Sequence, residues 1–456
     1  MVRPNCESVR FKLSCLLMLL LWGPARAASY DRGWQEFYLR HMPVAIAALQ
    51  QAVRQRPSDP MAHFMLSRAY FRNHQAGDAR RECQAALRHL DAASDEQRYM
   101  LNAWGWRMRP QRLDKARNNA DYGIAMYPDS AELYILRGEI EDNDLLATPY
   151  YLAALRLSPT HPLGRSWKPV VPPVPTVRAD SGPVTLRPLL KAPALFPGLG
   201  QVHHPIVTAN PKAQAYFTQG LCCLYAYVYS DARTSFEEAI ALDPKCAMAW
   251  WGLSFCTASD CTPLQAASRA LSLATTDAEK RYGAARVLQV QKRNGDCIVA
   301  LDGALAAYPN DVDLWIWRGT VTGFLGETYD GGRATRGMPF ILAAWRLQPD
   351  EPAANHELIH SYENINRPLL GWKYTIGFGR SAPNMPHAQH MQAHLAMRLG
   401  RWKEALACTR RSIKLELAGF PDADDAHHRN IYMWALCHEG RFVEASHAVR
   451  ASADDL

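Results

Sequence analysis

The sequence predicts an all-α fold, a solenoid of paired helices in two arrays that are joined by a proline-rich linker. Small residues and prolines recur at intervals of about 34 residues, which fits a repeating unit of two helices and their turns. Eight prolines between Lys168 and Gly200 interrupt this pattern. With 48% hydrophobic and 21% charged residues, the chain has the composition of a globular protein. Its net charge of +7 is spread over 456 residues, too thinly to favour a nucleic acid as partner.

Residues 1–27 are predicted to be a secretion signal. Basic residues precede an apolar run from Leu13 to Trp22, and the small residues at 25–27 form a cleavage site. The run is shorter than the roughly 20 apolar residues that cross a bilayer, and no later stretch is apolar enough to do so. We therefore expect an exported protein, periplasmic or secreted, without a membrane span.

The cysteines give only a weak pattern. There are 11 in the sequence, and removal of Cys6 and Cys15 with the signal leaves an odd number, so at least one thiol has no partner within the chain. Cys408 and Cys437 fall on facing helices of the repeat frame. A disulfide and two buried thiols are both compatible with that placement.

The helix pairs resemble the tetratricopeptide repeat, a helix–turn–helix unit of about 34 residues. Small residues let the two helices cross closely, and a proline ends the second one. The clearest unit has these features at Gly220, Ala232, Phe236, Ala239 and Pro244. The first array, residues 28–165, has them at Gly33, Ala45, Ala52, Pro57, Ser67, Ala79, Ala86, Ala116, Pro128, Gly138 and Pro159. The second array, residues 201–456, continues them at Trp250, Ser254, Pro309, Trp315, Gly319, Pro349, Gly371, Pro383, Ala405 and Ala445.

Two segments interrupt the repeats. Residues 166–200 are the predicted linker, and because proline removes amide donors and stiffens the chain, this segment is either a semi-rigid spacer or docked along one array. Residues 326–337 are rich in glycine and are interpreted as a flap over the groove. Tryptophans at helical spacing in the second array are interpreted as packing between helices rather than as a ligand cage. They are Trp250, Trp251, Trp315, Trp317, Trp345 and Trp372.

Histidines gather in the stretch 356–394. His356 and His360 are one helical turn apart and share one helix face. A second set shares one face of the next helix, namely His387, His390 and His394. Imidazole is the commonest metal-ligating side chain, so five histidines in register predict a divalent-metal site. Zinc, copper and iron all suit such ligands.

The repeat frame brings the two histidine faces together. In that frame His356, His360 and Glu363 take the fifth, ninth and twelfth positions of a first helix, and the second set takes the second, fifth and ninth positions of the next. Those positions line the concave groove in proteins of this repeat type, where packed helices lie roughly 8–10 Å apart. We therefore predict one metal site, with Glu363 as a ligand or as an acceptor that orients a histidine. His427 falls at its rim under a looser alignment.

Three blocks carry a closer resemblance. They are the segment 210–252, the motif at Asn355-His356, Ile359-His360 and Glu363, and the motif at His387, His390-Met391 and His394. Over residues 200–410 the chain resembles a family of exported bacterial tetratricopeptide proteins. The resemblance implies the architecture and the histidine set, and it implies no particular reaction. The chain departs from the family at Tyr229-Ser230, Glu357-Leu358 and Gln392-Ala393.

The departure at Glu357 creates an H-E-x-x-H motif from His356 to His360. In zinc hydrolases with this motif the glutamate is a general base, and His387 or Glu363 would here supply a third ligand. A copper or iron oxidoreductase is a second enzyme hypothesis. A polar groove for a peptide, without metal, also fits. The adopted interpretation is an exported scaffold that binds a protein or peptide and holds a divalent metal in the groove of the second array; the sequence alone does not decide whether it is an enzyme.

Overall fold

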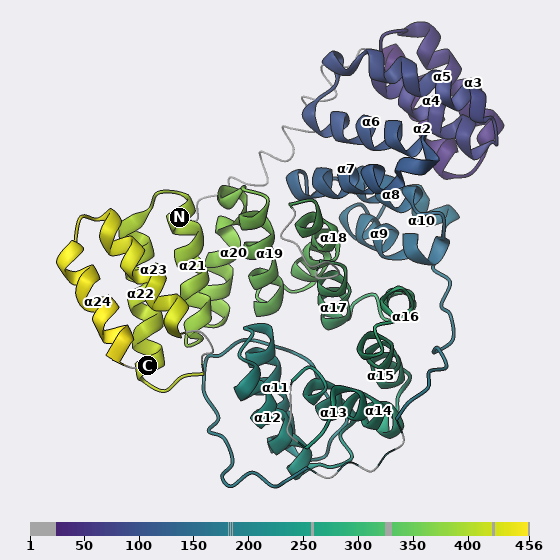
Figure 1. Cartoon of the computed structure of the whole chain (residues 1–456). Helices are drawn as coiled ribbons and strands as arrows, with labels where there is room; N and C mark the ends of the chain where they lie inside the picture. Colours follow the sequence, from purple (N-terminus) through teal and green to yellow (C-terminus); the bar gives the residue numbers. More distant parts are fainter. Residues whose placement is uncertain are drawn as a thin grey trace, which may run out of the picture. The chain divides into compact units, whose positions relative to one another are not determined.

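The computed structural model describes residues 24–180, 182, 184, 186–256, 260–323, 331–421 and 425–454. Over these residues the chain forms helices and turns and no strand, so the predicted all-α fold is confirmed. The chain divides into two compact units (Figure 1). The first unit comprises Met1–Asp142 and Tyr151–Lys168, and the second comprises Asn143–Tyr150 and Pro169–Leu456. Most of the predicted signal peptide, residues 1–23, lies outside the described residues.

The first unit consists of consecutive helices that pack in pairs. They are α2 (Pro24–Tyr38), α3 (Met42–Gln55), α4 (Pro60–Arg72), α5 (Ala76–Arg88), α6 (Asp95–Arg107), α7 (Leu113–Met126), α8 (Ala131–Ile140), α9 (Asp144–Leu157) and α10 (Leu163–Ser166), with 3₁₀ turns η1 (Leu90–Ala92) and η2 (Pro110–Arg112). Helix α9 contains the boundary, because its first residues belong to the second unit. Helices α2 and α3, α4 and α5, and α6 and α7 form the closest pairs.

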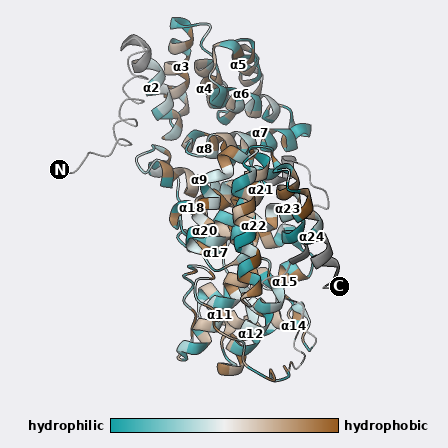
Figure 2. Cartoon of the chain, turned by 90° about the vertical axis from the view of Figure 1, so that its left-hand side faces the viewer, coloured by the Kyte–Doolittle hydropathy of each residue, from teal (hydrophilic) through white to brown (hydrophobic). Residues whose placement is uncertain are grey.

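The second unit continues the same alternation. Its helices are α11 (Pro211–Tyr225), α12 (Tyr229–Leu242), α13 (Ala247–Leu253), α14 (Pro263–Leu273), α15 (Asp277–Val290), α16 (Asn294–Ala307), α17 (Val312–Gly323), α18 (Gly331–Leu347), α19 (Pro352–Asn364), α20 (Pro368–Ser381), α21 (Pro386–Arg398), α22 (Trp402–Leu417), α23 (Asp425–His438) and α24 (Phe442–Asp454). In this unit each odd-numbered helix is called an A helix and packs with the B helix that follows it. In the first unit the A helices are α2, α4 and α6. Figure 2 shows hydrophilic and hydrophobic residues mixed along helices such as α22, as expected where one face is buried.

A left-handed residue recurs in the turn between A and B helices. Its φ is positive at Arg40, His74, Tyr227, Lys292 and Asn366, and glycine takes the same place at Gly400 and Gly440. One residue in this conformation ends a helix and redirects the chain. The turn residue therefore gives each helix pair a common reference point for numbering. For each A helix that ends in one, the residues ten and six positions before it are called its groove positions here.

Small residues permit the close crossings, as predicted. A Cβ on Gly220 would lie 2.6 Å from the Phe236 ring, and one on Gly252 would lie 2.4 Å from the same ring. Phe236 is fully buried between these A helices. The backbone of α11 and α13 thus packs directly on this side chain of α12, which fixes how successive repeats stack.

The proline-rich segment is docked along the second unit. The backbone N–H of Asp180 donates to Ser268 Oγ at 2.8 Å, and that of Phe196 donates to Gln219 Oε1 at 2.8 Å. Arg281 donates to the Pro172 carbonyl at 3.0 Å. Of the two arrangements that the sequence allowed, the structure has the docked one, because side chains of A and B helices satisfy polar backbone groups that proline-rich chain cannot pair internally.

Two expectations need correction. The glycine-rich segment is not an extended flap from 331 to 337, because α18 begins at Gly331; residues 324–330 lie outside the described residues. Gly337 instead lets α18 approach α17, since a Cβ there would lie 2.7 Å from the carbonyl oxygen of Gly319. Cys408 and Cys437 are both free thiols, the first buried and the second exposed, so neither a disulfide nor two buried thiols describes them. No helix in the described part of the chain is long and apolar enough to cross a membrane.

Candidate metal centre

The predicted histidines lie on two neighbouring A helices. Both α19 and α21 begin with a proline, whose fixed φ suits the first helical turn and whose missing N–H is not needed there. The two helices pack against each other. His356 and His360 are the groove positions of α19, and His390 and His394 are those of α21. The helical register that the sequence predicted is therefore the one observed.

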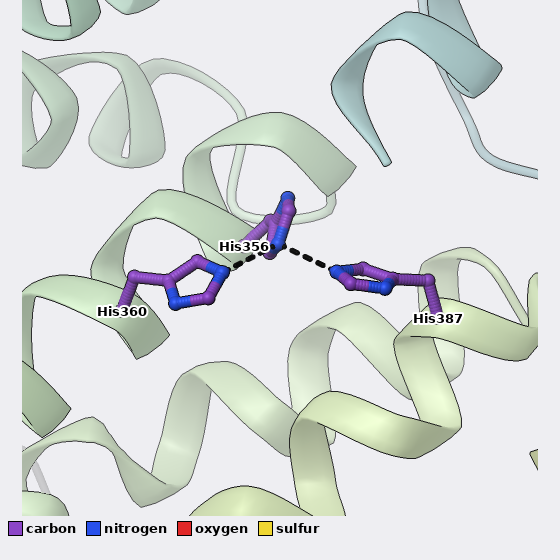
Figure 3. Close-up of side chains that lie close together, drawn as sticks. All are labelled: His356, His360 and His387. Carbon is purple, nitrogen blue, oxygen red and sulfur yellow. Dashed lines mark hydrogen bonds between the residues drawn. The ribbon is translucent and has the colours of Figure 1, made fainter. Parts of the chain in front are cut away.

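A first triad joins the two helices. His356 Nε2 lies 3.0 Å from His360 Nε2 on its own helix and 3.0 Å from His387 Nε2 on α21 (Figure 3). The three ligand nitrogens lie within 4.8 Å of one another. Nitrogens that share one tetrahedral zinc at about 2 Å are separated by about 3.3 Å. Small side-chain adjustments would thus place all three around one ion.

Hydrogen bonding fixes the tautomer of His356. Its Nδ1 donates to the backbone carbonyl of Tyr225 at 2.7 Å, and a carbonyl can only accept. In the neutral ring the proton is then on Nδ1, and the lone pair of Nε2 faces the other two histidines. An imidazole anchored in this way is the usual form of a metal-ligating histidine.

A second group of three histidines lies one helix pair further along the second unit. His394 Nε2 lies 2.8 Å from His390 Nε2 and 3.1 Å from His427 Nε2, the last on α23. His394 Nδ1 donates to Glu363 Oε1 at 3.2 Å, so its Nε2 also presents a lone pair to its two neighbours. Each triad therefore has a central ring whose outer nitrogen is anchored to an oxygen.

The two triads are related by the repeat itself. His390 and His394 follow His356 and His360 by 34 residues each, which is the length of one unit. Each triad combines both groove positions of one A helix with a histidine near the start of the next A helix. The rings of His387 and His390, one from each triad, have centroids 5.6 Å apart.

The structure thus differs from the single site predicted from the sequence. All five predicted histidines are brought together, but they divide between two groups, and His427 is a full member of the second. Glu363 lies on the outer side of His394, in the place of an orienting acceptor rather than among the grouped ligand atoms. Two groups form instead of one because His387, at the second position of α21, lies beside the histidines of α19. His390 and His394, at its fifth and ninth positions, lie beside His427 of α23.

Sequence reasoning missed His428. This residue is fully buried, its ring centroid lies 4.0 Å from that of His390, and Glu416 Oε1 accepts a hydrogen bond from its Nδ1 at 2.5 Å. Adjacent residues of a helix are rotated by about 100° around its axis, so only one of the pair His427-His428 fitted the groove pattern.

Burial keeps several of these histidines neutral. It lowers the pKa of His356, His387 and His390 well below the usual value, and neighbouring imidazoles add to the effect. Burial and the nearby His356 lower the pKa of His360 to about 3. Burial alone would raise the pKa of Glu363, but the interactions with His394, His360 and Arg398 together outweigh it and lower the value to about 2. Neutral imidazoles beside a charged carboxylate are the protonation states that metal binding needs.

Glu357 lies beside the first triad and faces a cavity. It accepts a hydrogen bond from the Tyr227 hydroxyl at 2.7 Å, and the ring of Tyr227 lies 4.6 Å from that of His356, centroid to centroid. Burial raises the pKa of Glu357 to about 7. The cavity that it borders has a volume of about 1040 Å³. Tyr227 therefore stands between the triad and this cavity.

One further group of potential ligands was not predicted. It consists of His204, Asp311 and Asp313, whose ligand atoms lie within 4.8 Å of one another. His204 Nδ1 lies 2.6 Å from Asp313 Oδ2, and burial together with Asp313 shifts the pKa of Asp311 upward. His204 pairs with the carboxylate of Asp313, so these side chains already neutralise each other without a metal ion.

Comparison with known proteins supports the repeat assignment. Residues 30–96 and 229–255 match the model of the tetratricopeptide repeat family. One segment lies in each unit. Both units contain tetratricopeptide repeats. The predicted tetratricopeptide solenoid is thereby confirmed, while the family of exported proteins with paired histidine motifs stays a prediction.

Several solved structures are similar to this chain. MamA 41-end from Desulfovibrio magneticus RS-1 has 11% identity and a TM-score of 0.34, over 39% of this chain and 93% of that one. Yeast Tom70 has 16% identity and a TM-score of 0.34, over 94% and 85%. A tetratricopeptide repeat protein from Parabacteroides merdae ATCC 43184 has 10% identity and a TM-score of 0.30, over 53% and 79%. No curated protein matches the sequence.

Proposed function

We propose that the protein is an exported tetratricopeptide scaffold that binds a protein or peptide partner and holds divalent metal ions in the two histidine triads of its second unit. The observation that carries the metal assignment is the repetition: both groove positions supply histidines twice, 34 residues apart, and in each triad one histidine is anchored to an oxygen. A polar groove that served only a peptide would not need two such arrangements. The partner assignment is supported by the repeat type, which forms a binding surface along its A helices.

Export is supported by the sequence pattern of residues 1–27. Intact mass measurement of material from the periplasm or culture medium should give a chain that begins at Ala28. Recovery of only the full-length chain from the cytoplasm would contradict export without affecting the metal assignment.

Metal stoichiometry tests the central part of the proposal. The chain is loaded with zinc, dialysed and analysed for metal, and the expected ratio is two ions per chain. His360→Ala should remove one equivalent and His394→Ala the other, because each variant deletes one ligand of a single triad. His447→Ala, an exposed histidine on α24, is the matched control and should retain both. Binding of less than one ion, or equal losses in the control, would contradict the assignment.

Glu357 supports a second candidate, a metal-dependent hydrolase. A carboxyl group whose pKa burial raises to about 7, beside the His356 triad and facing a large cavity, has the properties of a general base. Glu357→Gln would then abolish hydrolysis of a peptide library while zinc content stays at the wild-type level. Zinc-dependent hydrolysis that is unchanged in this variant would exclude the residue as the base, and an inactive wild type leaves the scaffold as the function.

A further inference from the structure

The cavity beside Glu357 contains a buried positive charge that none of the described residues neutralises. Arg286 on α15 is buried, and the three acceptors of its hydrogen bonds are neutral: Ser254 Oγ at 2.8 Å, the Ser254 carbonyl at 2.6 Å and Gln289 Oε1 at 2.6 Å. It forms no ion pair with a carboxylate of the described residues. A buried charge without an opposite charge is costly, and the cost shows in the pKa of Arg286, which burial lowers to about 9.

The first unit offers an internal comparison. Arg68 takes the later groove position of α4, six residues before the turn residue His74, just as Arg286 precedes Lys292. Arg68 is also buried, but Glu139 neutralises it through hydrogen bonds of 3.0 and 2.8 Å. The same position therefore has a carboxylate partner in the first unit and has none among the described residues of the second. The missing partner marks a place where an anion from outside the chain would fit.

A second donor points to the same requirement. Trp251 is 2% exposed, and its Nε1–H has no hydrogen-bond partner within the described part of the chain. Its ring packs edge-on against Phe255 at 4.8 Å between centroids, and the Arg286 guanidinium lies 3.7 Å from the centre of the same Phe255 ring. A donor without an acceptor and a charge without a counter-charge thus border the same cavity and contact the same ring.

The rest of the cavity wall is largely apolar. Trp251, Phe255, Ile316 and Trp317 line it, together with the exposed cation Lys292. Trp251 and Trp317 were expected from the sequence to pack between helices; they do pack, with centroids 5.5 Å apart, and they also face this space. At about 1040 Å³ the cavity is large enough for a small molecule. Flat aromatic walls favour a flat apolar body.

We propose that this cavity binds a small molecule with a flat apolar body and one carboxylate, and that the carboxylate pairs with Arg286 and accepts a hydrogen bond from Trp251. The planar guanidinium fork matches the two oxygens of a carboxylate. The apolar body lies against the aromatic wall that contains Trp251 and Trp317, and the far end approaches Tyr227 and Glu357. The inference goes beyond the proposed metal sites and does not depend on them.

Isothermal titration calorimetry with 2-naphthoate tests the proposal, in the presence of EDTA so that metal binding plays no part. The full chain should bind 2-naphthoate in a one-to-one ratio, and at least tenfold more tightly than the neutral 2-naphthalenemethanol. Tighter binding of 2-naphthyl phosphate would overturn the assignment of a carboxylate. Equal binding of acid and alcohol, or no binding of either, would overturn the proposal altogether.

Variants locate the site. Arg286→Gln removes the charge and should weaken 2-naphthoate binding about ten- to a hundredfold, with little effect on the alcohol. Trp251→Phe keeps the ring and removes the N–H, and is expected to cost about three- to tenfold; it covers the case in which Arg286→Gln does not fold. Arg293→Gln is the matched control, because this exposed arginine pairs with Asp296 and does not line the cavity. An affinity that is unchanged in both cavity variants would contradict the site.

Discussion

At the scale of single residues, the oxygen behind each central histidine decides what its ring can do. The Tyr225 carbonyl holds His356 and the Glu363 carboxylate holds His394, each through Nδ1. The carbonyl is neutral, whereas the carboxylate is charged and therefore strengthens the basicity of Nε2. The second triad thus has the stronger central ligand, although it is also the more exposed of the two, since His394 retains 18% of its side-chain exposure while His356 is fully buried.

Glu363 offers a way to weaken one triad alone. Glu363→Ala removes the acceptor of His394, so zinc affinity at the second triad should fall about 10- to 100-fold while the first triad keeps its affinity. Glu363→Gln keeps an acceptor without the charge, so its zinc affinity at the second triad should lie between those of Glu363→Ala and the unchanged chain. Competition with a chromophoric chelator in the His360→Ala background, where only the second triad is intact, measures the effect. An affinity in Glu363→Ala equal to that of its parent would show that the carboxylate does not support the ligand.

At the scale of helices, a glycine in contact with an aromatic ring sets how closely α11 approaches α12. Gly220→Ala would place a methyl group 2.6 Å from the buried Phe236 ring, so something must move. We expect a loss of about 1–3 kcal/mol in the free energy of unfolding, measured by denaturant titration. Gly295→Ala is the matched control, because nothing lies within 4 Å of the new methyl group on α16. That control should be neutral or slightly stabilising, by up to about 1 kcal/mol; similar losses in both variants would exclude the packing explanation.

A half-buried carboxylate joins several helices of the first unit. Glu132 on α8 accepts from Trp34 Nε1 at 2.9 Å and from the Tyr38 hydroxyl at 2.6 Å, and His161 Nε2 lies 3.2 Å away. Burial alone would raise the pKa of Glu132, but the hydrogen bond from His161 and the charge of Arg68 outweigh it, so the value is lowered. A lowered pKa means that the folded state binds this proton less readily than the unfolded state does.

The sign of the pH dependence follows from that difference. The stabilisation from Glu132 is fully present above the unfolded pKa of about 4.5 and is lost as pH falls through the lower folded value. Glu132→Gln should therefore be less stable than wild type at pH 7, and the difference in stability should narrow as the pH falls below about 4.5. Amide exchange of α4 and α8 in the full chain follows the first unit separately. A gap that widens on acidification would reverse the assigned sign.

Much of the helical scale could be predicted from the sequence, and the reasons are local. Small residues, prolines and a constant period identify the repeat, and the period alone places His356 and His390 at equivalent positions. The division into two triads could not be predicted, because it depends on whether the ring at 387 turns toward α19 or α23. That no described carboxylate pairs with Arg286 could not be predicted either. The sequence does not tell which carboxylates lie beside a given side chain once the helices have stacked.

At the scale of the whole molecule, one face changes character along the second unit. Aromatic and basic side chains of α13, α15 and α17 line the cavity around Arg286, and the corresponding face of α19 and α21 presents the histidines. Tyr227 touches both regions, with its hydroxyl on Glu357 and its ring 4.6 Å from that of His356. An occupant of the cavity and an ion in the first triad would therefore share one wall.

Metal removal should act on one part of this molecule and spare the other. An ion that binds only the folded state stabilises it by an amount that grows with the logarithm of ligand concentration over dissociation constant, about 2.7 kcal/mol at a hundredfold excess. Both triads lie in the second unit and connect α19, α21 and α23. EDTA should thus speed amide exchange in these three helices, while α3, α4 and α5 of the first unit serve as an internal reference and stay unchanged. His360→Ala with His394→Ala should make exchange in α19, α21 and α23 insensitive to zinc. Equal acceleration in both units would mean that the ions act elsewhere than at the triads.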